Sequence, residues 1–254
     1  MKRNVHKDYL SQTDALDDFV LNYSNRGEAF GNQDRNSLRL FKLDQVVLNA
    51  KSFRIPNLVN KIAYRFFRKS KAQRSFEYAN KLTDLGIGTP KPVAFYEFKS
   101  ALFFGKSYYL SHQQECEITY RELTTDFSIP NYEAILRAFT RFTFKLHENH
   151  VNFLDHSPGN TLIDISTEDY KFYLVDLNRM NFEPMSFEER IKNFSKLTIH
   201  KNMVEVMSDE YAKCINEDYD KVFNLMWQYT NEFQEKYHRK RRLKKKIKFW
   251  KTYD

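Results

Sequence analysis

The stretch FLDHSPGN, residues 153–160, places an aspartate, a proline, a glycine and an asparagine directly before an apolar run. A further aspartate follows in YLVDLN, residues 173–178. Proline and glycine predict a turn, with Asp155 at its start and Asn160 at its end. If this loop folds back on itself, both polar side chains face one cavity. The runs TLIDI and KFYLVDL predict a short hairpin that brings Asp176 back beside Asn160.

These three polar residues are suited to one kind of chemistry. Amide and carboxylate oxygens such as those of Asn160 and Asp176 are hard ligands that suit Mg²⁺, which takes few ligands from protein when phosphates supply others. Asp155 is a candidate base that accepts a proton from an attacking hydroxyl. A base and magnesium ligands are components of phosphoryl transfer. Taken alone, however, an Asp and an Asn beside a Pro-Gly pair are more often an ordinary turn.

Two charged residues upstream favour the phosphoryl-transfer interpretation. Lys51 ends a predicted strand, VVLNAKSF, and Glu77 lies on a predicted helix, Lys71–Leu85, which ends at Gly86. A strand lysine paired with a helix glutamate would hold the phosphates of a nucleotide. Either residue alone would be an ordinary surface charge, so the order of the whole set carries the interpretation.

The predicted elements indicate an α+β fold with two lobes. Short β-branched or aromatic runs predict strands in the first hundred residues, and apolar residues at helical spacing predict helices after Thr119. The strands are expected at 19–23, 37–43, 45–53, 93–98 and 107–111, with a short helix at 57–67 and later helices at 132–147 and 187–237. We therefore expect a β-rich N-lobe (1–115), a helical C-lobe (116–237) and a basic tail (238–254).

The composition is that of a globular protein with an anionic partner. Hydrophobic residues make up 41% of the chain, which is enough for a core. Cys116 and Cys214 lack metal-ligand spacing and are too few for a disulfide framework, so they are expected to be free thiols in a reducing compartment. The N-terminus has no apolar run typical of a secretory signal, and no stretch has the length needed to span a bilayer. These features predict a cytoplasmic protein.

The net charge of +8 is concentrated at the end of the chain, in HRKRRLKKKIKFWK. Such a segment predicts binding to nucleic acid, an acidic membrane face or a phosphorylated glycan. Its interleaved apolar residues favour an anionic membrane surface, since they supply an interfacial component: Leu243, Ile247, Phe249 and Trp250. A solvated helix end or an RNA-contacting arm is the alternative.

The segments around Lys51–Glu97, His147–Asp164 and Tyr173–Met180 resemble the Kdo/heptose kinases, lipopolysaccharide kinases related to eukaryotic protein kinases. The resemblance implies a protein-kinase-like fold that uses ATP and Mg²⁺. Lys51 would hold the α- and β-phosphates and pair with Glu77. Asp155 would be the catalytic base. The implied Mg²⁺ ligands are Asn160 and Asp176, and the implied nucleotide-covering loop is NRGEAFGNQDRN with Gly27 and Gly31.

The chain departs from the kinase pattern in three places. Phe153 stands where a histidine usually precedes the catalytic aspartate by two residues, so the loop must pack differently. The nucleotide-covering loop has only Gly27 and Gly31, and an ordinary hairpin turn explains it equally well. A long activation segment is missing after LNRM, which argues against a protein substrate. We interpret His147 and His150, at the end of the helix before the loop, as core or capping residues and not as ligands.

The expected function is therefore transfer of the γ-phosphate of ATP to a sugar hydroxyl of a lipopolysaccharide core, Kdo or heptose, or of a related glycolipid. Such an acceptor is lipid-linked, so we expect the protein at the inner face of the inner membrane. Two alternatives remain open. One is a small-molecule kinase of the aminoglycoside or choline type, and the other is an inactive kinase-like module that binds RNA or acts as a scaffold.

Overall fold

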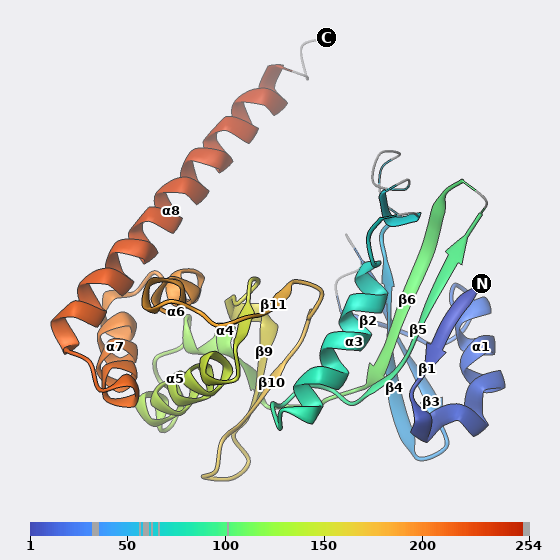
Figure 1. Cartoon of the computed structure of the whole chain (residues 1–254), viewed down its shortest axis with the longest axis horizontal. Coiled ribbons are helices and arrows are strands. Elements are labelled where there is room, and N and C mark those ends of the chain that lie inside the picture. Colours follow the sequence, from blue (N-terminus) through green and yellow to red (C-terminus); the bar gives the residue numbers. More distant parts are fainter. Residues whose placement is uncertain are drawn as a thin grey trace. The chain divides into compact units, whose positions relative to one another are not determined.

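The computed structural model divides the chain into two compact units (Figure 1). It describes the backbone of residues 1–250 except 32–35, 56, 58–60, 62, 66 and 101, and the side chains of these residues up to Lys244. The first unit contains residues 1–115 and 173–179. The second contains residues 116–172 and 180–254. Segment 173–179, which carries Asp176, thus belongs to the first unit although it follows the loop of the second.

The first unit is built on a six-stranded sheet with the strand order β1-β5-β6-β4-β3-β2. Each neighbouring pair is antiparallel. The predicted strands at 37–43, 45–53, 93–98 and 107–111 are confirmed within one to three residues at each end. The strands are β1 (Lys2–Val5), β2 (Glu28–Phe30), β3 (Ser37–Leu43), β4 (Val46–Phe53), β5 (Pro92–Lys99) and β6 (Phe104–His112).

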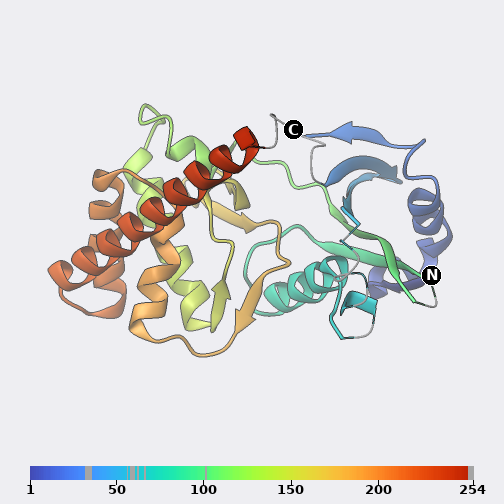
Figure 2. The ribbon, with the colours of Figure 1, turned by 90° about the horizontal axis from the view of Figure 1, so that it is seen from above.

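One helix packs on each face of this sheet (Figures 1 and 2). Successive side chains of β5 point to opposite faces of the sheet. The Phe95 ring lies 5.6 Å from that of Phe76 on α3 (Lys71–Asp84), between ring centroids. On the other face the Tyr96 hydroxyl donates to the Asp17 carboxylate of α1 (Thr13–Leu21) at 2.9 Å. The helix predicted at 71–85 is confirmed as α3.

The predicted strand at 19–23 is wrong, because these residues end α1 and the turn after it. Leu16, Phe19 and Val20 are buried, at the spacing of three and four residues typical of a helix. The short run 19–23 alone does not show this spacing. A 3-10 helix, Lys7–Gln12, precedes α1. The helix predicted at 57–67 falls mostly outside the described residues.

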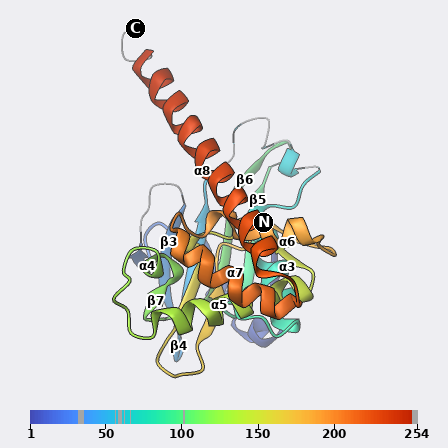
Figure 3. The same ribbon diagram turned by 90° about the vertical axis from the view of Figure 1, so that its left-hand side faces the viewer.

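Helices dominate the second unit (Figure 3). Its core is formed mainly by α5, α7 and α8, with aromatic and methionine side chains packed between them. Two small sheets accompany the helices, with the strand orders β10-β9-β7 and β11-β8. The elements are β7 (Ile118–Thr119), α4 (Tyr120–Leu123), α5 (Tyr132–Glu148), β8 (Val151–Phe153), β9 (Thr161–Asp164), β10 (Lys171–Leu174), β11 (Met180–Phe182), α6 (Phe187–Asn193), α7 (Lys201–Ile215) and α8 (Tyr219–Trp250), with 3-10 turns at Pro158–Asn160 and Phe194–Lys196.

The basic end of the chain is the continuation of α8 and not a separate tail. This helix runs through the expected boundary at residue 238 to Trp250. Its first half packs into the core of the second unit through Val222 and Met226, and its later half extends beyond α5, α6 and α7 (Figures 1 and 3). None of the helices among the residues that the structure describes combines the length and apolar character needed to cross a membrane.

Gly27 is required by the packing of the first unit. Its φ of +74° lies in the left-handed region, and an added Cβ would meet the Leu40 carbonyl oxygen at 2.7 Å and the Phe41 ring at 2.8 Å. We expect Gly27→Ala to lower the free energy of unfolding by about 1–3 kcal/mol, because the backbone must leave this strained conformation. Urea unfolding measures the change. Gly31→Ala is the control for strain without a clash, since the nearest atom that its Cβ would meet among the described residues is Leu38 Cδ1 at 3.8 Å.

Candidate active site

The loop after β8 folds back on itself as the sequence predicts. The Asn160 side-chain amide donates to the Asp155 carbonyl oxygen at 2.8 Å, and the Asn160 backbone amide donates to the Ser157 carbonyl at 2.9 Å. Pro158 begins the short 3-10 turn that returns the chain to β9. Because the amide nitrogen of Asn160 is used in closing the loop, its carbonyl oxygen is the atom left to bind a ligand. Asp155 is half-buried within this closed loop.

Asn193, at the end of α6, holds the strand that leads into the loop. Its amide nitrogen donates to the Phe153 carbonyl at 3.0 Å and to the Asn152 side chain at 3.1 Å. Its amide oxygen faces His147 Nε2 at 3.3 Å and His156 Nδ1 at 3.1 Å. An amide that uses both its donors and its acceptor in this way has one defined orientation. Asn193 therefore holds the Phe153 backbone before Leu154 and Asp155, and the His156 side chain after them.

This network also defines the state of two buried histidines. Because the Asn193 oxygen accepts from both rings, His147 carries its proton on Nε2 and His156 on Nδ1, and His147 Nδ1 accepts from the Tyr211 hydroxyl at 2.7 Å. Burial lowers the pKa of His147 to about 3 and that of His156 to about 4. Both rings are thus neutral at physiological pH, and the interpretation of His147 as a core residue is confirmed. His150 is exposed just after α5.

The departure at Phe153 now has a structural explanation. Phe153 is fully buried, and its ring lies 5.8 Å from that of His156, which also contacts the Phe139 ring at 5.4 Å, between centroids. A buried histidine is therefore present in this loop, but it follows the aspartate by one residue. Phenylalanine at 153 fills the space beside it without adding a second polar group to the core.

Two cations of the second unit contact the loop. Lys196 Nζ donates to the Leu154 carbonyl, immediately before Asp155. The guanidinium of Arg121, on α4, lies against Gly159, where an added Cβ would stand 2.6 Å from its terminal nitrogen. Glycine at 159 therefore permits this close approach. Neither contact is visible as a motif, because each cation lies far from the loop in sequence.

In the first unit, Lys51 and Asp176 form an ion pair. Lys51 Nζ, on β4, lies 2.7 Å from Asp176 Oδ1, and both side chains are partly shielded from solvent. The same oxygen accepts from the Asn178 side chain at 2.7 Å. Two hydrogen bonds hold segment 173–179 to residues just before β5. The Leu174 amide donates to the Gly88 carbonyl, and the Thr89 hydroxyl donates to the Leu174 carbonyl.

The expected pair of Lys51 with Glu77 is not formed among the described residues. Glu77 accepts from Lys69 Nζ at 2.8 Å and from Gln73, one turn earlier on α3, at 2.9 Å. Each residue of the expected pair therefore binds another partner. Glu77 pairs with Lys69, which is close in sequence, and Lys51 pairs with Asp176.

The two glycines of the expected nucleotide-covering loop lie at opposite ends of β2. Gly27 packs against β3 before the strand begins, and Gly31, with a φ of +63°, follows its last residue. Strands β2 and β3 pair antiparallel, so this segment is a hairpin. Residues 32–35 of the expected loop lie outside the described residues. Of the two glycines, only Gly31 lies in the connection between the strands.

The residues expected to bind Mg²⁺ offer suitable donor atoms. Asp176 supplies a carboxylate from the first unit, and Asn160 supplies an amide oxygen from the second, both hard ligands. Within the part of the chain that the structure describes, no group of three or more His, Cys, Asp or Glu side chains is placed to hold a metal.

We expect Asn193→Ala to lower the free energy of unfolding by about 1–3 kcal/mol, because it leaves the buried His147 and His156 nitrogens and the Phe153 carbonyl without partners. Urea unfolding measures the change. Asn181→Ala is a control, since Asn181 is exposed on β11. A loss below 0.5 kcal/mol, typical of a surface change, would contradict the role of Asn193.

We also expect stability to fall on acidification. Above pH 6.5 both histidines are neutral in the folded and the unfolded chain. Below that pH the unfolded chain binds protons that folded His147 and His156 exclude, until their pKa values of about 3 and 4 are reached. Each histidine should therefore cost about 1.4 kcal/mol per pH unit. Unfolding measured from pH 7 to pH 5 tests this, and His156→Asn should roughly halve the slope.

Comparison with known proteins gives one matching family and a similar solved structure. Residues 56–217 match the model of the lipopolysaccharide kinase (Kdo/WaaP) family. A solved structure described as WaaP in complex with acyl carrier protein superposes with a TM-score of 0.65 and 14% sequence identity, over 92% of this chain and 99% of that one. No curated protein sequence matches the chain. The fold is thus α+β and protein-kinase-like, with an antiparallel sheet in the first unit and helices in the second.

Proposed function

Because the chain belongs to the lipopolysaccharide kinase (Kdo/WaaP) family, we propose that it transfers the γ-phosphate of ATP to a sugar hydroxyl of a lipopolysaccharide core, Kdo or heptose, or of a closely related glycolipid. The family makes it a kinase. We propose three further points: the phosphate donor is ATP, the phosphate acceptor is a sugar hydroxyl, and that sugar is lipid-linked.

The observation that supports this proposal most directly is the closed loop of the second unit. Asn160 closes the loop through the backbone carbonyl of Asp155, which fixes the backbone that carries the Asp155 carboxylate. A carboxylate on a loop fixed by Asn193 and Lys196 suits a base that accepts the proton of an attacking hydroxyl. A fixed position matters because a small misplacement of a catalytic group can cost about 10²-fold in rate.

The remaining roles follow the family pattern. Lys51 would neutralise phosphate charge, and Glu77 would assist in placing it. When bound, Mg²⁺ would neutralise charge on the transferred phosphoryl group, with Asn160 and Asp176 as its protein ligands. Before nucleotide binds, Lys51 and Asp176 neutralise each other across 2.7 Å. With ATP and Mg²⁺ bound, Lys51 would pair with phosphate oxygens and Asp176 would help to hold the ion.

The test is phosphate transfer from ATP to defined lipopolysaccharide-core acceptors. Purified protein is incubated with Mg²⁺, ATP and core glycans that carry Kdo, heptose or both, and the products are analysed by mass spectrometry. Gain of one phosphate on a core sugar supports the proposal. Phosphorylation of an aminoglycoside or choline with none on any core glycan would favour a small-molecule kinase, and no ATP turnover at all would favour an inactive module.

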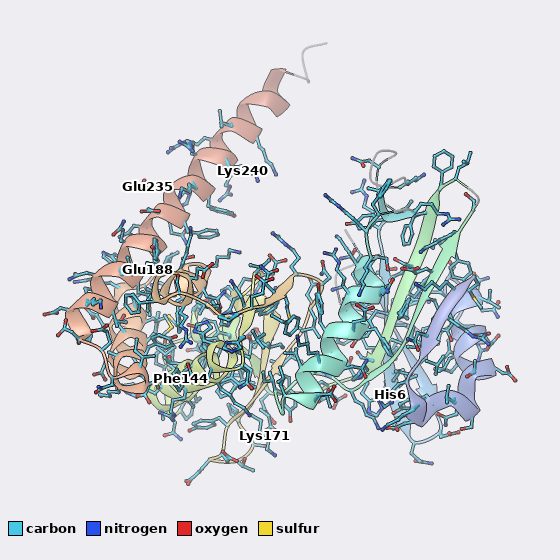
Figure 4. All side chains as sticks on the ribbon, in the orientation of Figure 1. His6, Phe144, Lys171, Glu188, Glu235 and Lys240 are labelled. Atoms are coloured by element: carbon cyan, nitrogen blue, oxygen red, sulfur yellow. The ribbon has the colours of Figure 1, made fainter. Side chains whose placement is uncertain are left out.

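We further propose that the later half of α8 binds an anionic membrane surface. The side chains of residues 238–244 are all exposed, and five of the seven are cations: Arg239, Lys240, Arg241, Arg242 and Lys244. Figure 4 shows Glu235 and Lys240 directed away from the axis of this helix. Each such cation contributes about 1 kcal/mol near an anionic surface, and Leu243, 55% exposed, adds an apolar contact. A lipid-linked acceptor would place the enzyme at the inner face of the inner membrane.

Neutralising these five cations to Gln tests the membrane proposal. Sedimentation with vesicles of anionic phospholipid should drop to the level of neutral vesicles, while helix content stays unchanged. The control neutralises the four lysines of the second unit that lie before residue 238 and line neither of its pockets: Lys171, Lys201, Lys213 and Lys221. If vesicle binding persists and binding to RNA or to acyl carrier protein is lost instead, the membrane assignment is wrong.

A further inference from the structure

The second unit contains a pocket of about 360 Å³ between the loop, α6 with the turn after it, and α8. From the loop it is lined by Leu154 and His156, the neighbours of Asp155 on either side. The other walls carry Lys192 and Lys196, and, from α8, Tyr229 and Phe233. We call this the α8 pocket. Its volume lies in the range of about 300–1,000 Å³ that is usual for small-molecule sites.

The carboxylates in the α8 pocket have hydrogen-bond partners, whereas one of its lysines forms no ion pair. Two carboxylates line it, but Glu189 accepts from the Ser186 amide at 2.9 Å, and Glu232 accepts from Gln228 at 3.0 Å and from Lys236 at 3.4 Å. Lys192 forms no ion pair within 4 Å among the described side chains, although its charge is one of the causes that lower the pKa of Glu232. The pocket thus presents a positive charge that is available to an anionic ligand.

The wall opposite the loop is aromatic. Tyr229 and Phe233 are four residues apart, so they share one face of α8. Lys192 Nζ lies over the Tyr229 ring, 5.6 Å from its centroid. A flat aromatic face beside a cation suits a ligand that has both an apolar face and an anionic group. A sugar ring that carries a carboxylate or a phosphate has this combination, because its C–H face packs on an aromatic ring while the anion pairs with the lysine.

We propose that the α8 pocket binds an anionic sugar unit of the acceptor, next to the hydroxyl that is phosphorylated, with Lys192 as its anion ligand and Tyr229 with Phe233 as its stacking surface. This inference rests on the proposed function in placing phosphoryl transfer at Asp155. Asp155 itself does not line the pocket, so the bound unit is a neighbour of the reacting sugar and not the reacting sugar itself.

Helix α8 would then contact both the acceptor, through the α8 pocket, and the membrane, through its exposed cations. The pocket residues of α8 end at Lys236, and the exposed cations begin at Arg239, one turn later. A glycolipid held at an anionic surface by its lipid part would therefore present its charged sugars next to the α8 pocket. This continuity also explains why the basic segment belongs to a helix that is anchored in the core.

Binding of soluble sugars to the full chain without nucleotide tests the proposal. The probes are Kdo as a sugar acid, glucose 6-phosphate as a sugar phosphate and glucose as the neutral control, with dissociation constants from ligand-observed NMR titration. We expect at least one anionic sugar to bind at least tenfold more tightly than glucose. Lys192→Gln should weaken that binding five- to tenfold. Loss with Kdo alone indicates a carboxylate ligand, and loss with glucose 6-phosphate alone indicates a phosphate ligand.

Lys201→Gln is a matched control, because Lys201 Nζ lies over the Phe223 ring at the same 5.6 Å but outside the α8 pocket. Its effect should be less than twofold. Equal binding of all three sugars, no detectable binding, or an unchanged constant in Lys192→Gln would each overturn the inference. Since no ATP is present, these outcomes do not depend on kinase activity. Conversely, phosphate transfer that survives with an unchanged KM in Lys192→Gln would leave the proposed function standing without the α8 pocket.

Discussion

Replacing Asp155 with Asn should lower phosphate transfer from ATP by about 10²–10⁴-fold, the usual contribution of a positioned general base. Asparagine keeps the size of the side chain but cannot accept a proton at neutral pH. The contacts that close the loop involve the backbone of residue 155, namely the bond from Asn160 to its carbonyl and that from Lys196 to the carbonyl before it. They should survive the substitution, so kcat should fall while the fold remains.

Two measurements separate this result from misfolding. Asp155→Asn should retain the unfolding midpoint within about 2 °C and should still bind ATP with Mg²⁺. Asp164→Asn is a control, since Asp164 is a loop-end carboxylate of the same unit that bonds only to Ser166 among the described residues. Wild-type turnover by Asp155→Asn would remove Asp155 from the role of base.

The second large effect concerns Asp176 and the stabilisation of the protein by nucleotide. At an ATP concentration 100-fold above its dissociation constant, bound ligand adds about 2.7 kcal/mol to the free energy of unfolding. Asp176→Asn should remove most of this gain, because the amide is a poorer magnesium ligand than the carboxylate. The measurement is the difference in unfolding free energy with and without Mg²⁺ and ATP, which corrects for the lost ion pair with Lys51.

A double-mutant cycle without nucleotide tests the pairing itself. Lys51→Ala and Asp176→Asn should be non-additive in unfolding free energy by about 0.5–1 kcal/mol, since the two side chains are in contact and partly shielded. Lys51→Ala and Glu77→Ala should be additive within about 0.3–0.5 kcal/mol, because Glu77 is paired with Lys69. Coupling in the second cycle and not in the first would mean that Lys51 pairs with Glu77 of α3, and not with Asp176, in the protein without nucleotide.

Local patterns were sufficient to predict most of the fold. The strands β3 and β4 and the helices α3 and α5 each have a period long enough to read, with clear ends such as Gly86 after α3. The strand predicted at 19–23 is wrong because five residues do not distinguish a strand from the end of a helix. The continuity of α8 past residue 238 was missed because a dense run of charges looked like a separate tail.

The candidate site was predictable only where its residues are close in sequence. The closure of the loop by Asn160 follows from spacing and turn chemistry. Asn193 and Lys196 lie more than thirty residues beyond Asp155, and nothing in their local sequence marks them as partners of the loop. The Lys51–Asp176 pair joins residues 125 apart, so only the fold reveals it. His156 carried the best missed signal, since a histidine directly after the key aspartate was present in the opening motif.

The most direct test of the central claim follows the phosphate itself. Purified protein, ATP labelled in its γ-phosphate, Mg²⁺ and core lipopolysaccharide are incubated in parallel for the wild type and for Asp155→Asn, and the labelled products are located by mass spectrometry. We expect label on a core sugar with the wild type and at least 100-fold less with the variant. Label on protein or on free small molecules, with none on the glycan, would contradict it.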